Sequence, residues 1–172
     1  MLSKSIEKAL NKQIRIEAES SQVYLAMAVW AEVKGLEGIS NFMYDHSDEE
    51  REHMLKLIKF VNERGGHAHI SELAAPSVEF SSFQVMFEKL LEHEISVSQS
   101  INELVHSSLQ EKDYATHNFI QWYVSEQIEE EATARTILDK VNMIGDDKGG
   151  LYLFDRDIQQ LNINSAAAED IE

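Results

Sequence analysis

Two stretches of the chain carry the same spacing of polar residues. These are Glu17 with Glu50-x-x-His53 and Glu94 with Gln127-x-x-Glu130, and in both stretches 33 residues separate the first two positions. Each of these residues interrupts an otherwise apolar stripe near the middle of a predicted helix. Carboxylates grouped inside a helical bundle are unfavourable unless a positive charge lies among them. A pair of metal ions is the simplest source of that charge.

The residue types indicate which metals would suit the site. Glu50 and His53 are three residues apart on a predicted helix, so they share a face and can hold one ion together. The chain has no cysteine, which excludes thiolate ligands and leaves iron, manganese or zinc for carboxylate oxygen and imidazole nitrogen. A single buried Glu or His is usually a hydrogen-bonded structural residue. Six polar residues at matching depth favour a metal site instead.

Four long amphipathic patterns must position these residues, because apolar side chains recur at steps of three and four. They predict helices over residues 3–34, 39–64, 82–110 and 114–144. Short turns near Gly35–Gly38 and Glu111–Asp113 join the first and last pairs into antiparallel hairpins. The sequence therefore predicts an all-α fold, a four-helix bundle in one domain that spans residues 1–172.

The segment between the hairpins, Gly65 to Phe80, has no periodicity and contains the only proline, Pro76. Its 16 residues can span roughly 50 Å when extended, whereas a 26-residue helix is about 39 Å long. It is long enough to cross the whole bundle, and we interpret it as a single long crossover. After a flexible break at Asp146–Gly150, a short fifth helix is predicted over residues 151–162, and the tail 165–172 is expected to be disordered.

The chain is strongly acidic, with a formal net charge of −16. This charge argues against nucleic acid and anionic membranes as partners, because phosphates need Lys and Arg. It suits a protein that attracts cations, although a soluble acidic surface would look the same. No signal peptide and no apolar run of membrane-spanning length is found, so a cytoplasmic protein is expected.

With these motifs the chain resembles the non-haem bacterial ferritins, a family of ferritin-like di-iron proteins, over nearly its whole length. The resemblance implies a first iron position at Glu17, Glu50 and His53. It implies a second position at Glu94, with Glu50 as the bridge and support from Gln127 or Glu130. It also implies a third, inward-facing iron position, whose matching residues are Glu49, Glu126, Glu129 and Glu130.

Two aromatic residues match family positions near the iron centre, Tyr24 and Trp122. Ordinary core packing explains each of them equally well. The acidic residues of the fourth predicted helix also have a simpler explanation, a solvated helix face, which we accept for Glu131. The remaining histidines are assigned to structural or surface roles: His46, His67, His69, His93 and His106.

The chain departs from related families in two places. Haem-binding relatives carry a methionine beside the bridging glutamate, where this chain has Arg51, and Met54 lies on a different face, so no haem is expected. Animal ferritins carry acidic residues at a threefold channel. The matching positions here are His117 and Ile120, so an acidic threefold channel is not expected and iron would enter elsewhere.

The function implied is iron storage with ferroxidase activity. Two Fe²⁺ ions are oxidised by O₂ or H₂O₂, and ferric mineral forms inside a hollow homo-oligomer, for which the resemblance implies 24 subunits. Gln127 carries one negative charge less than a glutamate would, which we expect to weaken the second position and help oxidised iron leave. The alternatives are a diiron oxygenase or peroxidase on the same bundle, and a non-catalytic bundle whose polar core sets only specificity.

Overall fold

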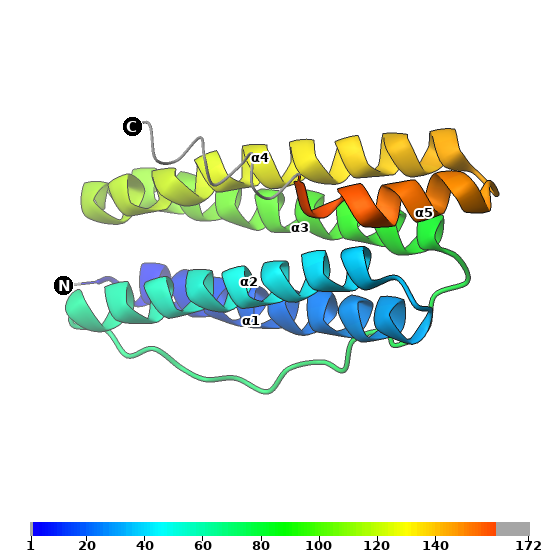
Figure 1. Cartoon of the computed structure of the whole chain (residues 1–172). Helices are drawn as coiled ribbons and strands as arrows, with labels where there is room; N and C mark the ends of the chain where they lie inside the picture. Colours follow the sequence, from blue (N-terminus) through cyan, green and yellow to red (C-terminus); the bar gives the residue numbers. More distant parts are fainter. Residues whose placement is uncertain (1, 161–172) are drawn as a thin grey trace.

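The computed structural model describes residues 2–160, and helices are the only regular secondary structure in that range (Figure 1). The helices are α1 (Lys4–Val33), α2 (Glu37–Glu63), α3 (Phe83–Gln110), α4 (Tyr114–Ile144) and α5 (Lys148–Asp157). The predicted all-α four-helix bundle with a short fifth helix is confirmed. No helix in the described range is both long and apolar enough to cross a membrane.

The helices pack as two hairpins, α1 with α2 and α3 with α4. The connection over residues 64–82 runs along the outside of the first hairpin and brings the chain to the far end of the bundle, where α3 begins (Figure 1). The crossover therefore spans the length of the bundle. It contains no helix or strand.

The largest difference from the sequence-based boundaries is at α5. The predicted break at Asp146–Gly150 is wrong in its second half, because α5 already begins at Lys148. The side chain of Asp147 accepts hydrogen bonds from the backbone N–H groups of Gly149 and Gly150, at 3.1 and 3.0 Å, and so caps the helix. The helix runs to Asp157, and its predicted end at residue 162 lies outside the described residues. The tail 165–172 lies outside the described residues.

Helix α5 packs against α2 and α4. The backbone N–H of Ile39 donates to Asp155 Oδ1 at 2.9 Å, which ties the start of α2 to α5. Gly38 permits this approach, since a Cβ atom there would lie 1.6 Å from the carbonyl oxygen of Asp155. The start of α2 at Glu37, two residues before the predicted boundary, belongs to the same junction.

Two apolar clusters fill the bundle, one towards each end. One cluster contains Tyr24, Phe42 and Phe87, and the other contains Leu10 and Leu57, each with many further residues. Most of the buried polar residues lie between these clusters along all four long helices, whereas Ser40, Ser108 and Thr116 are buried nearer the helix ends. Those between the clusters are Gln13, Glu17, Ser20, Ser21, His46, Ser47, Glu50, His53, Glu94, Ser100 and Gln127. We call this set the polar layer; it crosses the middle of the bundle.

Candidate metal centre

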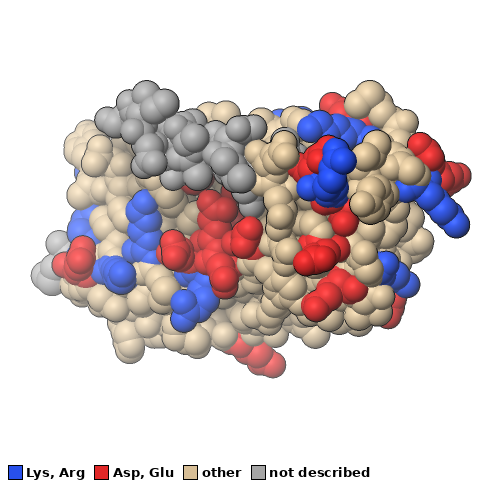
Figure 2. All heavy atoms as spheres, in the orientation of Figure 1, with Lys and Arg blue, Asp and Glu red and all other residues tan. Residues whose placement is uncertain are grey.

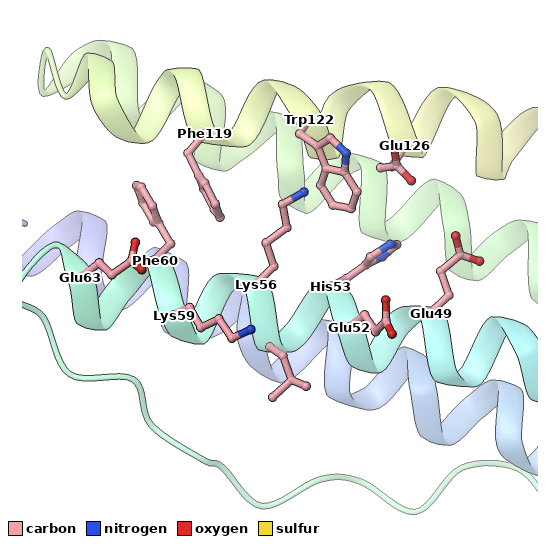
Figure 3. A pocket seen from close by; sticks show the side chains of 11 residues that line it. Glu49, Glu52, His53, Lys56, Lys59, Phe60, Glu63, Phe119, Trp122 and Glu126 are labelled. Atoms are coloured by element: carbon pink, nitrogen blue, oxygen red, sulfur yellow. The ribbon is translucent and has the colours of Figure 1, made fainter. Parts of the chain in front are cut away.

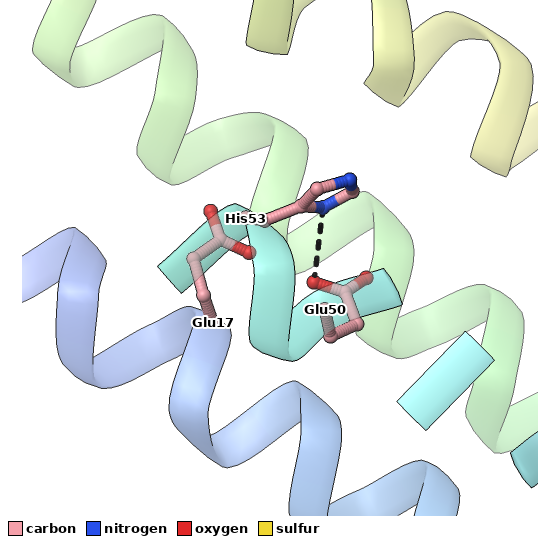
Figure 4. Close-up of side chains that lie close together, drawn as sticks. All are labelled: Glu17, Glu50 and His53. Carbon is pink, nitrogen blue, oxygen red and sulfur yellow. Dashed lines mark ion pairs between the residues drawn. The ribbon is translucent and has the colours of Figure 1, made fainter. Parts of the chain in front are cut away.

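The polar layer brings Glu17 from α1 together with Glu50 and His53 from α2 (Figure 4). One ligand atom from each residue lies within 4.8 Å of the other two, and all three side chains are buried. His53 Nδ1 is 3.4 Å from Glu50 Oε2. Two carboxylates and one imidazole supply both the negative charge and the donor types that divalent iron or zinc prefers.

A hydrogen-bond chain from α3 orients the first of these carboxylates. Ser100 Oγ donates to Gln13 Oε1 at 2.8 Å, and Gln13 Nε2 donates to Glu17 Oε1 at 2.9 Å. Both Gln13 and Ser100 are buried. One oxygen of the Glu17 carboxylate is thereby held in place beside Glu50 and His53. Outer partners of this kind fix the geometry of metal ligands.

We expect Gln13→Leu to weaken metal binding at Glu17 without unfolding the bundle. The substitution keeps a side chain of similar size but removes the donor to Glu17, so the affinity for Co²⁺ should fall about 10–100-fold. Anaerobic Co²⁺ titration, followed by visible absorbance, measures this. Gln121→Leu, at an exposed position on α4, is the matched control, and equal Co²⁺ affinity in the two variants would contradict the role of Gln13.

Burial makes the negative charges of the polar layer unfavourable. Desolvation, with the nearby charge of Glu50, raises the pKa of Glu17 well above its usual value. Desolvation likewise raises the pKa of Glu50 to about 8 and that of Glu94 well above its usual range. Among the described residues, Glu50 Oε2 and Glu94 Oε1 are buried oxygens without a hydrogen-bond partner. Buried carboxylate oxygens without hydrogen bonds and raised carboxyl pKa values fit a site that takes a cation.

The raised pKa of Glu50 predicts how chelator-stripped protein responds to pH. Folded Glu50 keeps its proton up to about pH 8, whereas an unfolded glutamate loses it near 4.5. The stabilisation is therefore complete below about pH 4.5 and is lost as pH rises through 8. We expect Tm to fall between pH 6 and pH 8, by roughly 2–4 °C for each kcal/mol lost.

Glu50→Gln is the variant that tests this assignment. It should flatten the fall of Tm but not remove it, because Glu17 and Glu94 shift in the same direction. Zn²⁺ should raise the Tm of the unsubstituted chain most at pH 8. A Tm that does not change with pH, or an identical slope in Glu50→Gln, would contradict the account.

Glu94 on α3 is directed by Gln127 on α4. Gln127 Nε2 lies 3.1 Å from Glu94 Oε2 and 3.3 Å from the Glu94 backbone oxygen, and it donates to both. The amide oxygen of Gln127 therefore points away from these contacts and can serve as a ligand. Glu94 is not in the group formed by Glu17, Glu50 and His53, although the charge of Glu17 contributes to its raised pKa.

A second group joins His46, Glu49 and Glu130 across α2 and α4. His46 Nε2 is 3.6 Å from Glu130 Oε2. Burial alone would lower the pKa of His46, but the hydrogen bond and charge of Glu130 outweigh it and raise the pKa. The same pairing outweighs desolvation at Glu130 and lowers its pKa. His46 thus holds the carboxylate of Glu130 in its charged form.

A third group contains Glu49, His53 and Glu126 (Figure 3). His53 belongs to both this group and the one with Glu17, so its two ring nitrogens can serve two positions. The group lies in the wall of a 660 Å³ pocket between α2 and α4, where Lys56 Nζ is 3.0 Å from the Trp122 ring centroid. Glu49 and Glu126 are half-buried, and Glu129 is exposed and outside all three groups.

The two aromatic candidates lie close to the polar layer. Tyr24 is fully buried and packs edge-on against His46 and His93 at 6.3 and 5.6 Å. Within the described part of the chain, its hydroxyl is buried without a hydrogen-bond partner. Trp122 packs edge-on against His53 at 5.0 Å. Each ring touches a polar residue of the layer, so both packing and a role in the chemistry remain consistent with their positions.

Sequence reasoning did not identify the contacts of His46, Gln13 and Ser100. His46 is expected in a structural or surface role, and the structure shows it buried and paired with Glu130. Its signal in the sequence was its place four residues before Glu50 on the same stripe. Gln13 stands four residues before Glu17 in the same way. Ser100 gives no comparable signal, because small polar residues are common within helices.

Acidic side chains also mark the surface, and Figure 2 shows them gathered near the middle of one face, flanked by Lys and Arg side chains. A cation would thus meet negative charge both outside and inside the bundle.

Comparisons with known proteins agree with the fold. The ferritin family model, described as a ferritin-like domain, matches residues 7–144. The chain is 44% identical to a probable bacterial non-heme ferritin-like protein of Haemophilus influenzae, covering 94% of this chain and 98% of that protein. It is also 44% identical to the bacterial non-heme ferritin of Campylobacter jejuni, covering 95% and 98%.

Solved ferritin structures also resemble the chain. An open pore ferritin from Archaeoglobus fulgidus is 43% identical, with a TM-score of 0.91 over 92% of this chain and 98% of that one.

Proposed function

The chain belongs to the ferritin family, and from this premise we propose that it oxidises Fe²⁺ in the polar layer and stores the product as ferric mineral. The observation that carries the proposal is the buried group Glu17, Glu50 and His53, with a raised carboxyl pKa at Glu50 and a Glu50 oxygen that makes no hydrogen bond. Iron is the substrate here. The donors are oxygen and nitrogen only, which suits Fe²⁺.

The residues divide into iron positions. We assign the first position to Glu17, Glu50 and His53. The second uses Glu94 and the amide oxygen of Gln127, with Glu50 as the bridge between the two. The carboxylate oxygens of Glu50 and Glu94 that make no hydrogen bond then gain a positive partner. Because burial raises the pKa of Glu50, a cation that binds there displaces a proton.

The electron balance of the reaction is simple. Two Fe²⁺ ions each give up one electron, and O₂ takes both electrons with two protons to become H₂O₂. H₂O₂ as the oxidant takes two electrons and two protons and becomes two waters. Hydrolysis of each Fe³⁺ to oxyhydroxide then releases three protons. The protein's contribution is to hold two irons close together through carboxylates that can exchange.

A third iron position would receive iron on its way out of the centre. The resemblance assigns it to Glu49, Glu126, Glu129 and Glu130. The grouping of Glu49 with His53 and Glu126 supports two of these residues, and the grouping of Glu130 with His46 and Glu49 supports another. Glu129 is exposed in a single chain, so its participation would need a different rotamer. Arg51 stands at the haem methionine position, and we propose that no haem is bound.

Storage requires a hollow assembly, and one face of the chain is suited to self-association. Leu25, Val29 and Val33 on α1 are 37%, 48% and 79% exposed. With Pro76 and Val78 of the crossover, they line a 410 Å³ pocket. Exposed apolar surface of this kind marks an interaction site. We propose a homo-oligomer with this face at a subunit contact, 24 subunits by family resemblance, in the cytoplasm.

The test of storage is aerobic Fe²⁺ loading followed by size-exclusion chromatography. Ferric iron should elute with a large protein assembly, in amounts well beyond the few ions per chain that discrete sites can bind. A species near the chain mass of 19.6 kDa, or twice that, carrying only those few ions, would contradict it.

That same outcome would favour a diiron oxygenase or peroxidase, whose substrate could reach His53 through the pocket between α2 and α4. The pocket is lined by four glutamates and two lysines, so it does not suit an apolar substrate.

A further inference from the structure

The start of the crossover is fixed to α1 by hydrogen bonds between α1 side chains and the crossover backbone. The N–H of His67 donates to Glu7 Oε1 at 2.8 Å. Asn11 makes two hydrogen bonds to the same segment. Its Nδ2 donates to the His67 carbonyl at 3.0 Å, and its Oδ1 accepts from the His69 N–H at 2.6 Å. Ala68 N–H donates to Asn62 Oδ1 at 3.1 Å. Three consecutive residues of an irregular segment are therefore held in place.

These hydrogen bonds hold the segment so that two imidazole rings lie side by side on the surface. Side chains two residues apart point to the same side of an extended segment. The rings of His67 and His69 lie with centroids 4.6 Å apart and planes tilted by 33°. Both residues are exposed. They lie outside the polar layer and are not part of the proposed iron chemistry.

We propose that His67 and His69 together bind a divalent ion of the class that prefers nitrogen, such as Ni²⁺, Cu²⁺ or Zn²⁺. Imidazole is a strong ligand for these ions, with metal–nitrogen distances near 2.0–2.1 Å for zinc. Two rings at this separation can reach one ion through small side-chain rotations. Water fills the other coordination positions, and the carboxylate of Glu7, which accepts from the His67 N–H, adds a negative charge at the same segment.

The hydrogen bonds to the backbone distinguish this pair from two unrelated surface histidines. A flexible loop must be ordered when it binds an ion, at a cost of roughly 1–2 kcal/mol for each residue fixed. Here Asn11 and Glu7 have already ordered the segment, so more of the binding free energy remains. The site is nitrogen-rich and exposed, whereas the polar layer is carboxylate-rich and buried.

Immobilised Ni²⁺ provides a probe that reaches only surface sites, since the polar layer is inaccessible to a metal fixed on a resin. The untagged full-length protein should be retained, and His67→Gln or His69→Gln should elute at a several-fold lower imidazole concentration. His106→Gln removes a lone exposed histidine of α3 and should behave as the unsubstituted protein. Asn11→Ala keeps both rings but loosens the segment, and should lower Ni²⁺ affinity by about tenfold.

Two results would overturn the proposal. One is full retention of the His67→Gln/His69→Gln double variant. The other is an equal loss of retention with His106→Gln, which would show that scattered histidines bind the resin. Aerobic Fe²⁺ oxidation by the double variant should stay unchanged, which verifies folding and keeps this result independent of the proposed storage function.

Discussion

Glu50→Gln is expected to remove the fast phase of aerobic Fe²⁺ oxidation, with a loss of at least about 100-fold in initial rate. Glu50 is the proposed bridge between both iron positions, so its loss weakens both at once. The substitution keeps the size of the side chain but removes the charge that a cation needs. Stopped-flow absorbance after mixing Fe²⁺ with aerobic protein measures the rate.

The matched control is Glu92→Gln, which removes an exposed carboxylate two residues before Glu94. It should oxidise Fe²⁺ at the unsubstituted rate. His53→Ala and Glu94→Ala should resemble Glu50→Gln, because each removes one ligand of a single centre. Equal rates in Glu50→Gln and Glu92→Gln would mean that oxidation occurs at the acidic surface.

Val29→Asp is expected to break the assembly into species close to the mass of one or two chains. Val29 is 48% exposed in the single chain and lies in the apolar face with Leu25 and Val33. A carboxylate buried against a second apolar surface would cost several kcal/mol unless it were paired. Repetition at every subunit contact multiplies that cost. Sedimentation velocity measures the mass.

Val29→Ala is the control, since it removes similar packing but adds no charge, and it should stay assembled. Far-ultraviolet circular dichroism should show equal helix content in both variants, because the side chain points away from the bundle core. An intact assembly in Val29→Asp would place the subunit contact on another face.

The bundle could be predicted because its signals are local. Apolar residues at steps of three and four define the helices, and Gly35 and Gly65 adopt positive φ angles at the ends of α1 and α2. The polar layer followed from the same stripes, since Glu17, Glu50 and Glu94 interrupt them. Their burial between two apolar clusters is what the spacing predicted.

What the sequence could not supply depends on partners distant along the chain or on competing local signals. Glu130 is the partner that explains His46, and it lies on a different helix. The role of Gln13 is visible only from its hydrogen bonds to Ser100 and Glu17. At α5, the glycines Gly149 and Gly150 suggested a break, but the capping side chain of Asp147 outweighed their low helix propensity.

The assignment of individual iron ligands stays a prediction, and Glu129 illustrates why. Its place in the sequence matches a third iron position, yet its side chain is exposed and outside the three groups. A helix face turns by about 100° per residue. Glu129 and Glu130 therefore point in clearly different directions, and only one of them reaches the buried groups.

The most direct test of a di-iron centre in the polar layer is a crystal soaked anaerobically with Fe²⁺ and measured on both sides of the iron absorption edge. The account predicts two anomalous peaks inside each bundle. One should lie among Glu17, Glu50 and His53, and the other between Glu50 and Glu94 near Gln127. Iron bound only at surface carboxylates, with no anomalous peak in the polar layer, would contradict it.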